Sequence, residues 1–300
     1  MSKTKAWIQA ARLRTLPLSL SGIIVAAAIA ITEEVFSGII FGLSLLTTLS
    51  FQILSNFAND YGDGVKGTDN ADRIGPKRAL QSGILNAHQL KQGMLINSVI
   101  SMLLSAVLIL IAFWQRDWTY MLVYSALGVF AVTAAITYTV GKGAYGYMGL
   151  GDLFVFLFFG IVGVVAAYFL YTDQLNREIV WLSMCIGCLS TAVLNLNNMR
   201  DRINDDRVGK NTLAVRLGSQ GSRVYHCLLI LTAILFALLF LLTRQNNWWL
   251  IPAVALLPLI PHLIRVLRVS DPAQFDPELK KVALSTFAFA LLIFICSLSL

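Results

Sequence analysis

The sequence predicts an all-α, polytopic membrane protein in which residues 1–300 form one domain, a bundle of nine transmembrane helices. Hydrophobic residues make up 57% of the chain and charged residues only 13%, whereas soluble domains average roughly 25% charged residues. Mean hydropathy is +0.72, and apolar stretches of about 20 residues, long enough to cross a bilayer, recur along the whole chain. These values exclude a disordered chain, a disulfide-rich secreted module and an ordinary cytosolic enzyme.

Each apolar stretch is expected to be a helix, because a helix satisfies its own backbone hydrogen bonds where water is absent. A cleaved signal peptide is the alternative interpretation of the first stretch. The stretch is long for the apolar core of such a peptide, and eight more stretches follow it, which argues against this alternative. The eighth contains Pro252, Pro258 and Pro261, which predict a kink. In chain order the predicted spans are about 16–32, 38–57, 94–114, 119–140, 151–171, 179–198, 225–243, 248–264 and 283–300.

Lysine and arginine residues are distributed unevenly about these spans. With the N-terminus in the cytoplasm, 20 of the 23 fall on the cytoplasmic side, and only Arg116, Arg177 and Arg244 fall on the other side. Because cytoplasmic loops are enriched in Lys and Arg, we expect a cytoplasmic N-terminus. The net charge of +7 is spread between apolar stretches and forms no single basic stripe, which argues against a nucleic-acid partner.

Seven of the 16 acidic residues fall in two short segments, each at the cytoplasmic end of an even-numbered span. The first segment begins with N-D-Y-G-D at 59–63 and continues to Asp69 and Asp72. The second begins with N-N-M-R-D at 197–201 and continues to Asp205 and Asp206. Ordinary solvated loop charges are the alternative explanation, but the repeated Asn-x3-Asp core argues against it. The repeat predicts two related Asp-rich halves, spans two to five and spans six to nine.

The spacing within each segment indicates a ligand face. Residues four apart lie on one side of a helix, so Asn59 stacks with Asp63, and Asn197 stacks with Asp201 and Asp205. Two such faces that meet across a bundle would form a cluster of oxygen ligands. Such ligands suit Mg²⁺, which proteins usually hold by a few carboxylates together with substrate phosphate oxygens.

Basic residues accompany the carboxylates. Arg73, Lys77 and Arg78 follow the first segment, Lys210 follows the second, and Lys142 lies between the halves. Arginine binds phosphate as a fork and lysine as a point charge. The positive-inside rule alone would explain such residues, but it explains less well those that lie close to the carboxylates. Carboxylates for Mg²⁺ and several nearby cations predict a diphosphate site.

The motifs resemble those of the UbiA-type intramembrane aromatic prenyltransferases, which attach polyprenyl tails to quinone rings. The last matching stretch resembles in particular the branch that acts on 1,4-dihydroxy-2-naphthoate. The wider family often has a third acid where this chain has Gly67, and Asp69 is expected to take its role. The matching stretches are R-L-R-T-L-P (12–17), N-D-Y-G-D (59–63), D-R-I-G-P (72–76), T-Y-T (137–139), G-L-G-D (149–152), N-N-M-R-D (197–201) and G-K-N-T-L-A-V-R-L-G (209–218).

The resemblance implies an activity and its participants. It implies nine helices, with Asp-rich motifs after the second and the sixth, and Mg²⁺ as the cofactor. The implied reaction transfers a polyprenyl group from polyprenyl diphosphate to 1,4-dihydroxy-2-naphthoate, with loss of diphosphate and CO₂, and gives a demethylmenaquinone. The implied location is a bacterial inner membrane, with the active site facing the cytoplasm and no obligate protein partner.

The resemblance also implies roles for individual residues. Tyr138, with Asp201 or Asp205, is expected to polarise a ring hydroxyl, and the carboxylates are expected to act in catalysis through the metal. The expected Mg²⁺ ligands are Asp60, Asp63, Asp69, Asp201 and Asp205. The expected substrate-binding residues are Asn59, Asn197, Arg73, Lys77, Arg78, Lys142 and Lys210.

Two other classes of membrane protein fit the sequence less well than a prenyltransferase. An ion-coupled secondary transporter would place ionisable residues near the bilayer midplane, whereas the acids here lie at span ends. A CDP-alcohol phosphotransferase requires D-G-x2-A-R, and Asp63-Gly64 is not followed by that pattern. A prenyltransferase with another aromatic acceptor, such as 4-hydroxybenzoate, remains an alternative, and the prenyl length, the number of Mg²⁺ ions and the oligomeric state stay open.

Overall fold

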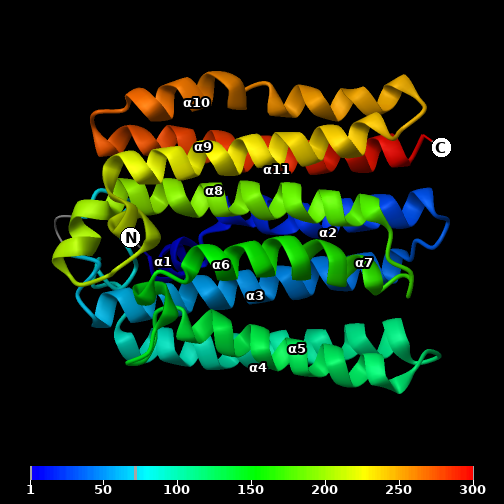
Figure 1. Ribbon diagram of the computed structural model, residues 1–300. Helices are drawn as coiled ribbons and strands as arrows, with labels where there is room; N and C mark the ends of the chain where they lie inside the picture. The colour runs from blue at the N-terminus through cyan, green and yellow to red at the C-terminus, as the bar shows by residue number, and fades with distance from the viewer. Residues whose placement is uncertain (1, 71–72, 300) are drawn as a thin grey trace.

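The computed structural model describes residues 2–70 and 73–299, and every regular element in these residues is helical. Asp72 of the first acidic segment lies outside them. The helices lie side by side along one axis, and the two chain ends lie at opposite ends of the bundle (Figure 1). The long helices are α2 (Leu16–Thr32), α3 (Gly38–Val65), α4 (Ala87–Phe113), α5 (Trp118–Thr137), α8 (Arg177–Arg207), α9 (Leu213–Leu242) and α11 (Phe275–Ser297).

Shorter elements complete the bundle. The segments α6 (Gly151–Val155), η3 (Phe156–Ala166) and α7 (Ala167–Phe169) form one continuous span. The remaining short elements are α1 (Lys3–Ala11), η1 (Leu13–Thr15), η2 (Tyr145–Met148), η4 (Asn247–Leu256), α10 (Leu259–Arg268) and η5 (Pro272–Gln274). Within the described residues, eight helical segments are long and apolar enough to cross a membrane, and the bent pair α1–α2 raises this number to nine.

The local sequence explains where several helices begin. Ser37 accepts a hydrogen bond from the Ile40 amide at the start of α3, and Asn176 accepts one from the Ile179 amide at the start of α8. Asn86 and Gln89 form a reciprocal capping box at the start of α4. Such side-chain caps satisfy amides that have no partner inside the helix. These caps fix where the three helices begin.

The structure places a helical segment at each predicted span, with two differences in shape. α3 continues to Val65 and α8 continues to Arg207, so both acidic segments lie on helices that project beyond the apolar core. The eighth predicted span is not one kinked helix. It is the 3₁₀-helix η4, which contains Pro252, followed by α10. Proline lacks the amide that an α-helix interior requires, which explains the break.

The central helices pack closely because glycine residues face one another. η3 is a π-helix, a wider form of helix that is often found at functional sites. A methyl group on Gly22 of α2 would lie 2.6 Å from the Gly163 carbonyl oxygen of η3. A methyl group on Gly160 of η3 would lie 3.0 Å from the Cα atom of Gly187 in α8. Small residues thus bring α2, η3 and α8 together, as is common in membrane bundles.

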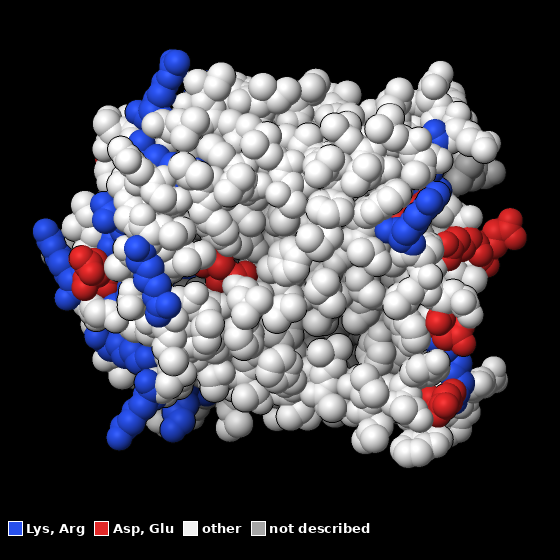
Figure 2. All heavy atoms as spheres, viewed as in Figure 1, with Lys and Arg blue, Asp and Glu red and all other residues white. Residues whose placement is uncertain are grey.

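Burial and charge follow the expected membrane pattern. The largest apolar core lies between α2, η3, α8, α9 and α11, whereas few residues of α5 are buried. Figure 2 shows charged side chains gathered at the two ends of this face, with the middle covered by other residues. An uncharged belt between two charged ends is the surface expected of a protein embedded in a bilayer.

Candidate active site

The ends of α3 and α8 meet at one end of the bundle. The Lys210 ammonium lies 3.1 Å from Oδ2 of Asp63, and the side-chain amide of Asn204 donates a hydrogen bond to the Thr68 carbonyl at 3.1 Å. These pairs are 147 and 136 residues apart in the chain. The two acidic segments, which the sequence predicts to converge, therefore lie side by side.

A cavity of about 370 Å³ opens between them. Its charged end combines four carboxylates with four cations. The carboxylates belong to Asp63, Asp69, Asp201 and Asp205. The cations belong to Arg12, Arg73, Arg78 and Lys210, and the predicted Asn59 and Asn197 lie beside them.

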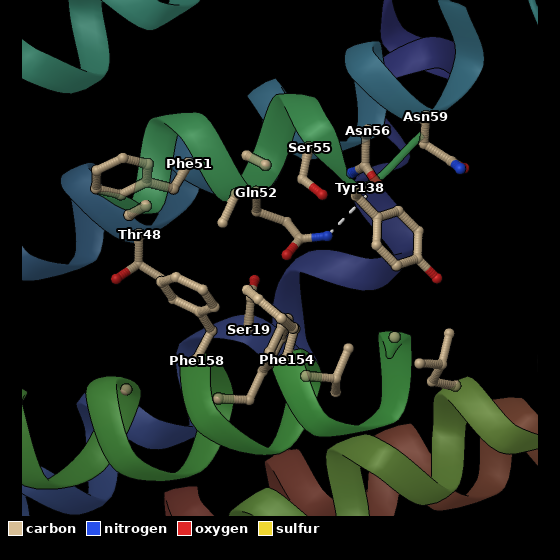
Figure 3. A pocket seen from close by; sticks show the side chains of 18 of the residues that line it. Ser19, Thr48, Phe51, Gln52, Ser55, Asn56, Asn59, Tyr138, Phe154 and Phe158 are labelled. Atoms are coloured by element: carbon tan, nitrogen blue, oxygen red, sulfur yellow. Dashed lines mark hydrogen bonds between the residues drawn. The ribbon is translucent and has the colours of Figure 1, made fainter. Parts of the chain in front are cut away.

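The rest of the cavity is mostly apolar, with some serine, threonine and glutamine side chains, and it runs along the bundle. Phe154 of α6 and Phe158 of η3 line it across from Phe51 of α3 (Figure 3). Ser44 and Asp63, both on α3, line it as well. At 1.5 Å per residue these two positions are about 28 Å apart along the helix axis, close to the roughly 30 Å thickness of a hydrocarbon core. The cavity therefore has a charged head and a long apolar arm.

Asp63 is the most fully hydrogen-bonded carboxylate of the site. Asn59, one turn earlier on the same face, donates to its Oδ2 at 2.9 Å, and the Tyr147 hydroxyl donates to its Oδ1 at 2.7 Å. Burial raises the pKa of Tyr147, and the charge of Asp63 raises it further, so the hydroxyl stays protonated and donates. Burial lowers the pKa of Lys210, but Asp63 and Asp205 more than offset this effect, so Lys210 stays charged.

Asp69 lies among arginines in the loop after α3. Its Oδ1 is 2.9 Å from Nε of Arg73 and 3.9 Å from Nε of Arg78. Burial raises the pKa of the Asp69 carboxyl, and the two arginines only partly oppose this effect. Neither oxygen of Asp69 has a hydrogen bond of good geometry to any residue that the structure describes. This buried carboxylate therefore retains capacity for another cation.

Three arginines crowd the charged end of the cavity. Burial lowers the pKa of Arg78, and the charges of Arg12 and Arg73 lower it further. Among the described residues, the buried Nε atoms of Arg12 and Arg78 have no hydrogen-bond partner. Arg12 donates to Asn59 and has a left-handed backbone with φ 50°, a strained conformation for a residue other than glycine. Crowded guanidinium groups with unused donors fit a polyanion such as a diphosphate.

The donor set fits a hard cation that is shared with a ligand. Among the described residues, no group of three or more Asp, Glu, His or Cys side chains is arranged to hold a metal ion alone. Asp63, Asp69, Asp201 and Asp205 nevertheless line one cavity, and the buried Oδ1 of Asn204 has no hydrogen-bond partner within residues 2–70 and 73–299. Mg²⁺ usually takes only part of its coordination from protein carboxylates and the rest from water and phosphate oxygens. The residues therefore fit Mg²⁺ bound together with a diphosphate.

Three predicted residues lie elsewhere. The carboxylate of Asp60 accepts hydrogen bonds from the Ala79 and Leu80 amides at 3.0 and 3.3 Å and does not line the cavity. Lys77 and Lys142 are exposed and lie outside the lining that the described residues form. The structure thus brings together most of the predicted set but separates these three side chains from it.

Tyr138 lines the cavity. Sequence reasoning missed two other lining residues, Arg12 and Asn204, and also Tyr147, which reaches the site through its hydrogen bond to Asp63. Burial raises the pKa of Tyr138 to about 12, so its hydroxyl is a hydrogen-bond donor near neutral pH. Arg12 is the first residue of R-L-R-T-L-P (12–17), one of the stretches that resemble the family, so the sequence did contain a signal for it. Tyr147 lies in a glycine-rich segment with no recognisable ligand pattern.

Comparison with known proteins identifies relatives over nearly the whole chain. A protein named 1,4-dihydroxy-2-naphthoate octaprenyltransferase from Haemophilus influenzae is 42% identical over 285 residues, which cover 94% of this chain and 92% of the relative. A protein of the same name from Escherichia coli is 40% identical over 303 residues, with coverage of 98% and 97%.

Solved structures share the fold. A UbiA homologue from Archaeoglobus fulgidus superposes with a TM-score of 0.66 at 12% identity, over 98% of this chain and 100% of that one. A structure of a UbiA homologue from the same organism bound to Cd²⁺ gives a TM-score of 0.57 at 12% identity, over 96% and 99%. The model of the UbiA prenyltransferase family matches residues 19–277. With that match, and with relatives at 40% and 42% identity, the chain belongs to the UbiA prenyltransferase family.

Proposed function

We propose that the protein transfers a polyprenyl group from polyprenyl diphosphate to 1,4-dihydroxy-2-naphthoate, with release of diphosphate and CO₂. The observation that carries the proposal is the cavity, which joins a head of carboxylates and arginines to a mostly apolar arm and extends about 28 Å from Asp63 in the head to Ser44. A polyprenyl diphosphate has the same two parts. The names of the relatives at 40% and 42% identity support the choice of acceptor.

The basic residues hold the diphosphate and stabilise it as it leaves. Arg12, Arg73, Arg78 and Lys210 surround the head of the cavity and balance the charge that develops on the leaving group. Asp63, Asp69, Asp201 and Asp205 are the proposed Mg²⁺ ligands. When bound, Mg²⁺ supplies further positive charge at the phosphate oxygens. The Cd²⁺-bound archaeal homologue supports a divalent cation in this fold.

The acceptor then reacts with the freed allylic carbon. The bond from that carbon to the diphosphate oxygen breaks, the electron-rich naphthoate ring bonds to the carbon, and the carboxylate leaves as CO₂. The product is a demethylmenaquinone in its reduced, quinol form. The proposed role of Tyr138, which lines the cavity with a protonated hydroxyl, is to donate a hydrogen bond to a ring oxygen of the acceptor.

The charged end of the cavity is proposed to face the cytoplasm of a bacterial cell, with the bundle in the inner membrane. The concentration of Lys and Arg in the loops at this end supports that orientation. The polyprenyl donor is itself a lipid, so an apolar arm within the bundle lets it bind without leaving the bilayer. No obligate protein partner is required for this chemistry.

Product identification tests the proposal. Purified protein in detergent is incubated with Mg²⁺, a polyprenyl diphosphate and either 1,4-dihydroxy-2-naphthoate or 4-hydroxybenzoate, and the products are identified by mass spectrometry. We expect a prenylated, decarboxylated naphthalene product and no prenylated hydroxybenzoate. At a fixed, low Mg²⁺ concentration Asp63→Asn and Asp201→Asn should lower turnover at least about 10-fold, whereas Asp206→Asn, which changes an exposed acid beside the second motif, should not. Near wild-type turnover in both motif variants would refute the proposed site.

A further inference from the structure

Arg200 precedes Asp201 in the second motif and is almost fully buried, with 2% of its surface exposed. Its Nε donates to Oδ1 of Asp201 at 3.0 Å and its Nη2 donates to Oδ2 at 2.7 Å, so one guanidinium fork holds both carboxylate oxygens. Asp201 lines the cavity, whereas Arg200 lies outside the lining that the described residues form. Because each carboxylate oxygen has two lone pairs, the fork leaves acceptor capacity for a ligand in the cavity.

This contact is unusual for neighbours on a helix. Adjacent residues project about 100° apart and do not ordinarily face each other. The fork forms because the side chain of Arg200 bends across to α11, where its Nη1 donates to Oδ1 of Asp276. Asp276 lies in the first turn of α11 and is 76 residues away in the chain. The guanidinium therefore bridges α8 and α11.

The loop after α3 also packs against the guanidinium group of Arg200. A methyl group on Gly75 would lie 2.7 Å from Nη2 of Arg200 and 2.8 Å from Nη2 of Arg73. Arg73 in turn lies 3.8 Å from Oδ2 of Asp201. A larger residue at position 75 would push the ends of these two guanidinium groups aside. Arg200 is thus fixed from three sides, and through it the carboxylate of Asp201 is fixed as well.

We infer that Arg200 is a positioning residue that orients Asp201 toward a divalent cation in the cavity, and that Asp276 of α11 sets the position of Arg200. Buried carboxylate ligands of metals are commonly held by a second layer of hydrogen bonds, and this layer controls affinity. Asp276 also balances part of the charge of Arg200, so Asp201 retains more of its own negative charge for the cation. The inference rests on the proposed function, because it takes Asp201 as a cation ligand.

Cation affinity measured without turnover tests this assignment. Mn²⁺ serves as a paramagnetic probe, and its dissociation constant is measured by electron paramagnetic resonance on purified, full-length protein with inorganic pyrophosphate present. The variants are Arg200→Met and Asp276→Asn. The matched controls are Arg202→Met on the same turn of α8 and Asp271→Asn in η5, whose side chain only caps that turn. A second measurement is the Mg²⁺ concentration that gives half-maximal prenyl transfer.

Arg200→Met should weaken Mn²⁺ binding about 10- to 100-fold. Asp276→Asn should weaken it about 2- to 5-fold, because the Asp276 side chain is 42% exposed and an exposed pair contributes little. The Mg²⁺ requirement should rise in parallel, with a much smaller change in the rate at saturating Mg²⁺. Unchanged or tighter Mn²⁺ binding in Arg200→Met would overturn the inference. If that variant fails to fold, unchanged binding in Asp276→Asn overturns it instead. A wild-type protein that binds no Mn²⁺ would refute the proposed cation site itself.

Discussion

The two aspartates of the first motif should have separable roles. The structure places Asp63 at the cavity with Lys210, whereas Asp60 accepts hydrogen bonds from the Ala79 and Leu80 amides. Asp60 is 1% exposed and holds the loop that carries Arg78. Substitution of Asp60 should therefore act mainly on stability, and substitution of Asp63 mainly on cation and diphosphate binding.

The size of the stability effect follows from these contacts. Asparagine keeps one acceptor oxygen, so Asp60→Asn leaves one of the two buried amides without a partner. A hydrogen bond to a charged group contributes about 1.5–3 kcal/mol to the free energy of unfolding. For a chain of this size that loss corresponds to a fall of about 3–6 °C in the midpoint of thermal unfolding. The Mg²⁺ concentration for half-maximal activity should change little in this variant.

The comparison uses both variants in detergent. Thermal unfolding is followed by the fluorescence of the six tryptophans, and prenyl transfer is measured across a Mg²⁺ titration. Asp63→Asn should raise the Mg²⁺ requirement at least about 10-fold, in the range seen when a metal site loses a supporting group. An Asp60→Asn variant with wild-type thermal stability and a Mg²⁺ requirement as high as that of Asp63→Asn would refute this reasoning.

Three further substitutions test the packing and charge of the site. Tyr147→Phe removes the hydroxyl that donates to Asp63 and should lower kcat/KM about 10- to 100-fold, whereas Tyr171→Phe, which removes a hydroxyl without a partner, should leave it unchanged. Lys210→Met should raise the KM for the prenyl diphosphate at least about 10-fold in steady-state assays, because it leaves Asp63 without its lysine partner beside the substrate. Lys91→Met, which changes an exposed residue of α4, is the control and should leave this KM unchanged. Gly62→Ala should destabilise the protein by about 1–3 kcal/mol in thermal unfolding, because its methyl group would lie 2.8 Å from the Thr139 backbone carbon. Gly38→Ala, with open space around it, should not.

The sequence predicts the spans well because a bilayer leaves helices as the only economical structure. The four-residue spacing also places Asn59 beside Asp63, and these side chains are hydrogen-bonded at 2.9 Å. It does not distinguish Asp60, which belongs to the same motif but lies about 100° around the helix from Asn59. That rotation turns Asp60 toward the following loop, and only the path of this loop reveals its partners.

Other parts of the site depend on contacts that are distant in the chain. Tyr147 reaches Asp63 across 84 residues, and no local pattern around Tyr147 indicates this. Arg12 lines the cavity from the bend between α1 and α2, where its own backbone is left-handed, a conformation that the residue type does not favour. Lys77 and Lys142 show the opposite case, since proximity in sequence to a motif did not bring them to the cavity.

The pairing of Lys210 with Asp63 has a consequence for how the chain is assembled in the membrane. Synthesis and insertion proceed from the N-terminus, so α3 is in place long before the segment 147 residues further along emerges. Until then Asp63 lacks the ammonium that balances its charge, and the nascent first half holds an acid without its counter-ion. The second half therefore completes the electrostatics of the first as well as the active site. An early truncation before α8 should leave a fragment that the cell's membrane quality control removes.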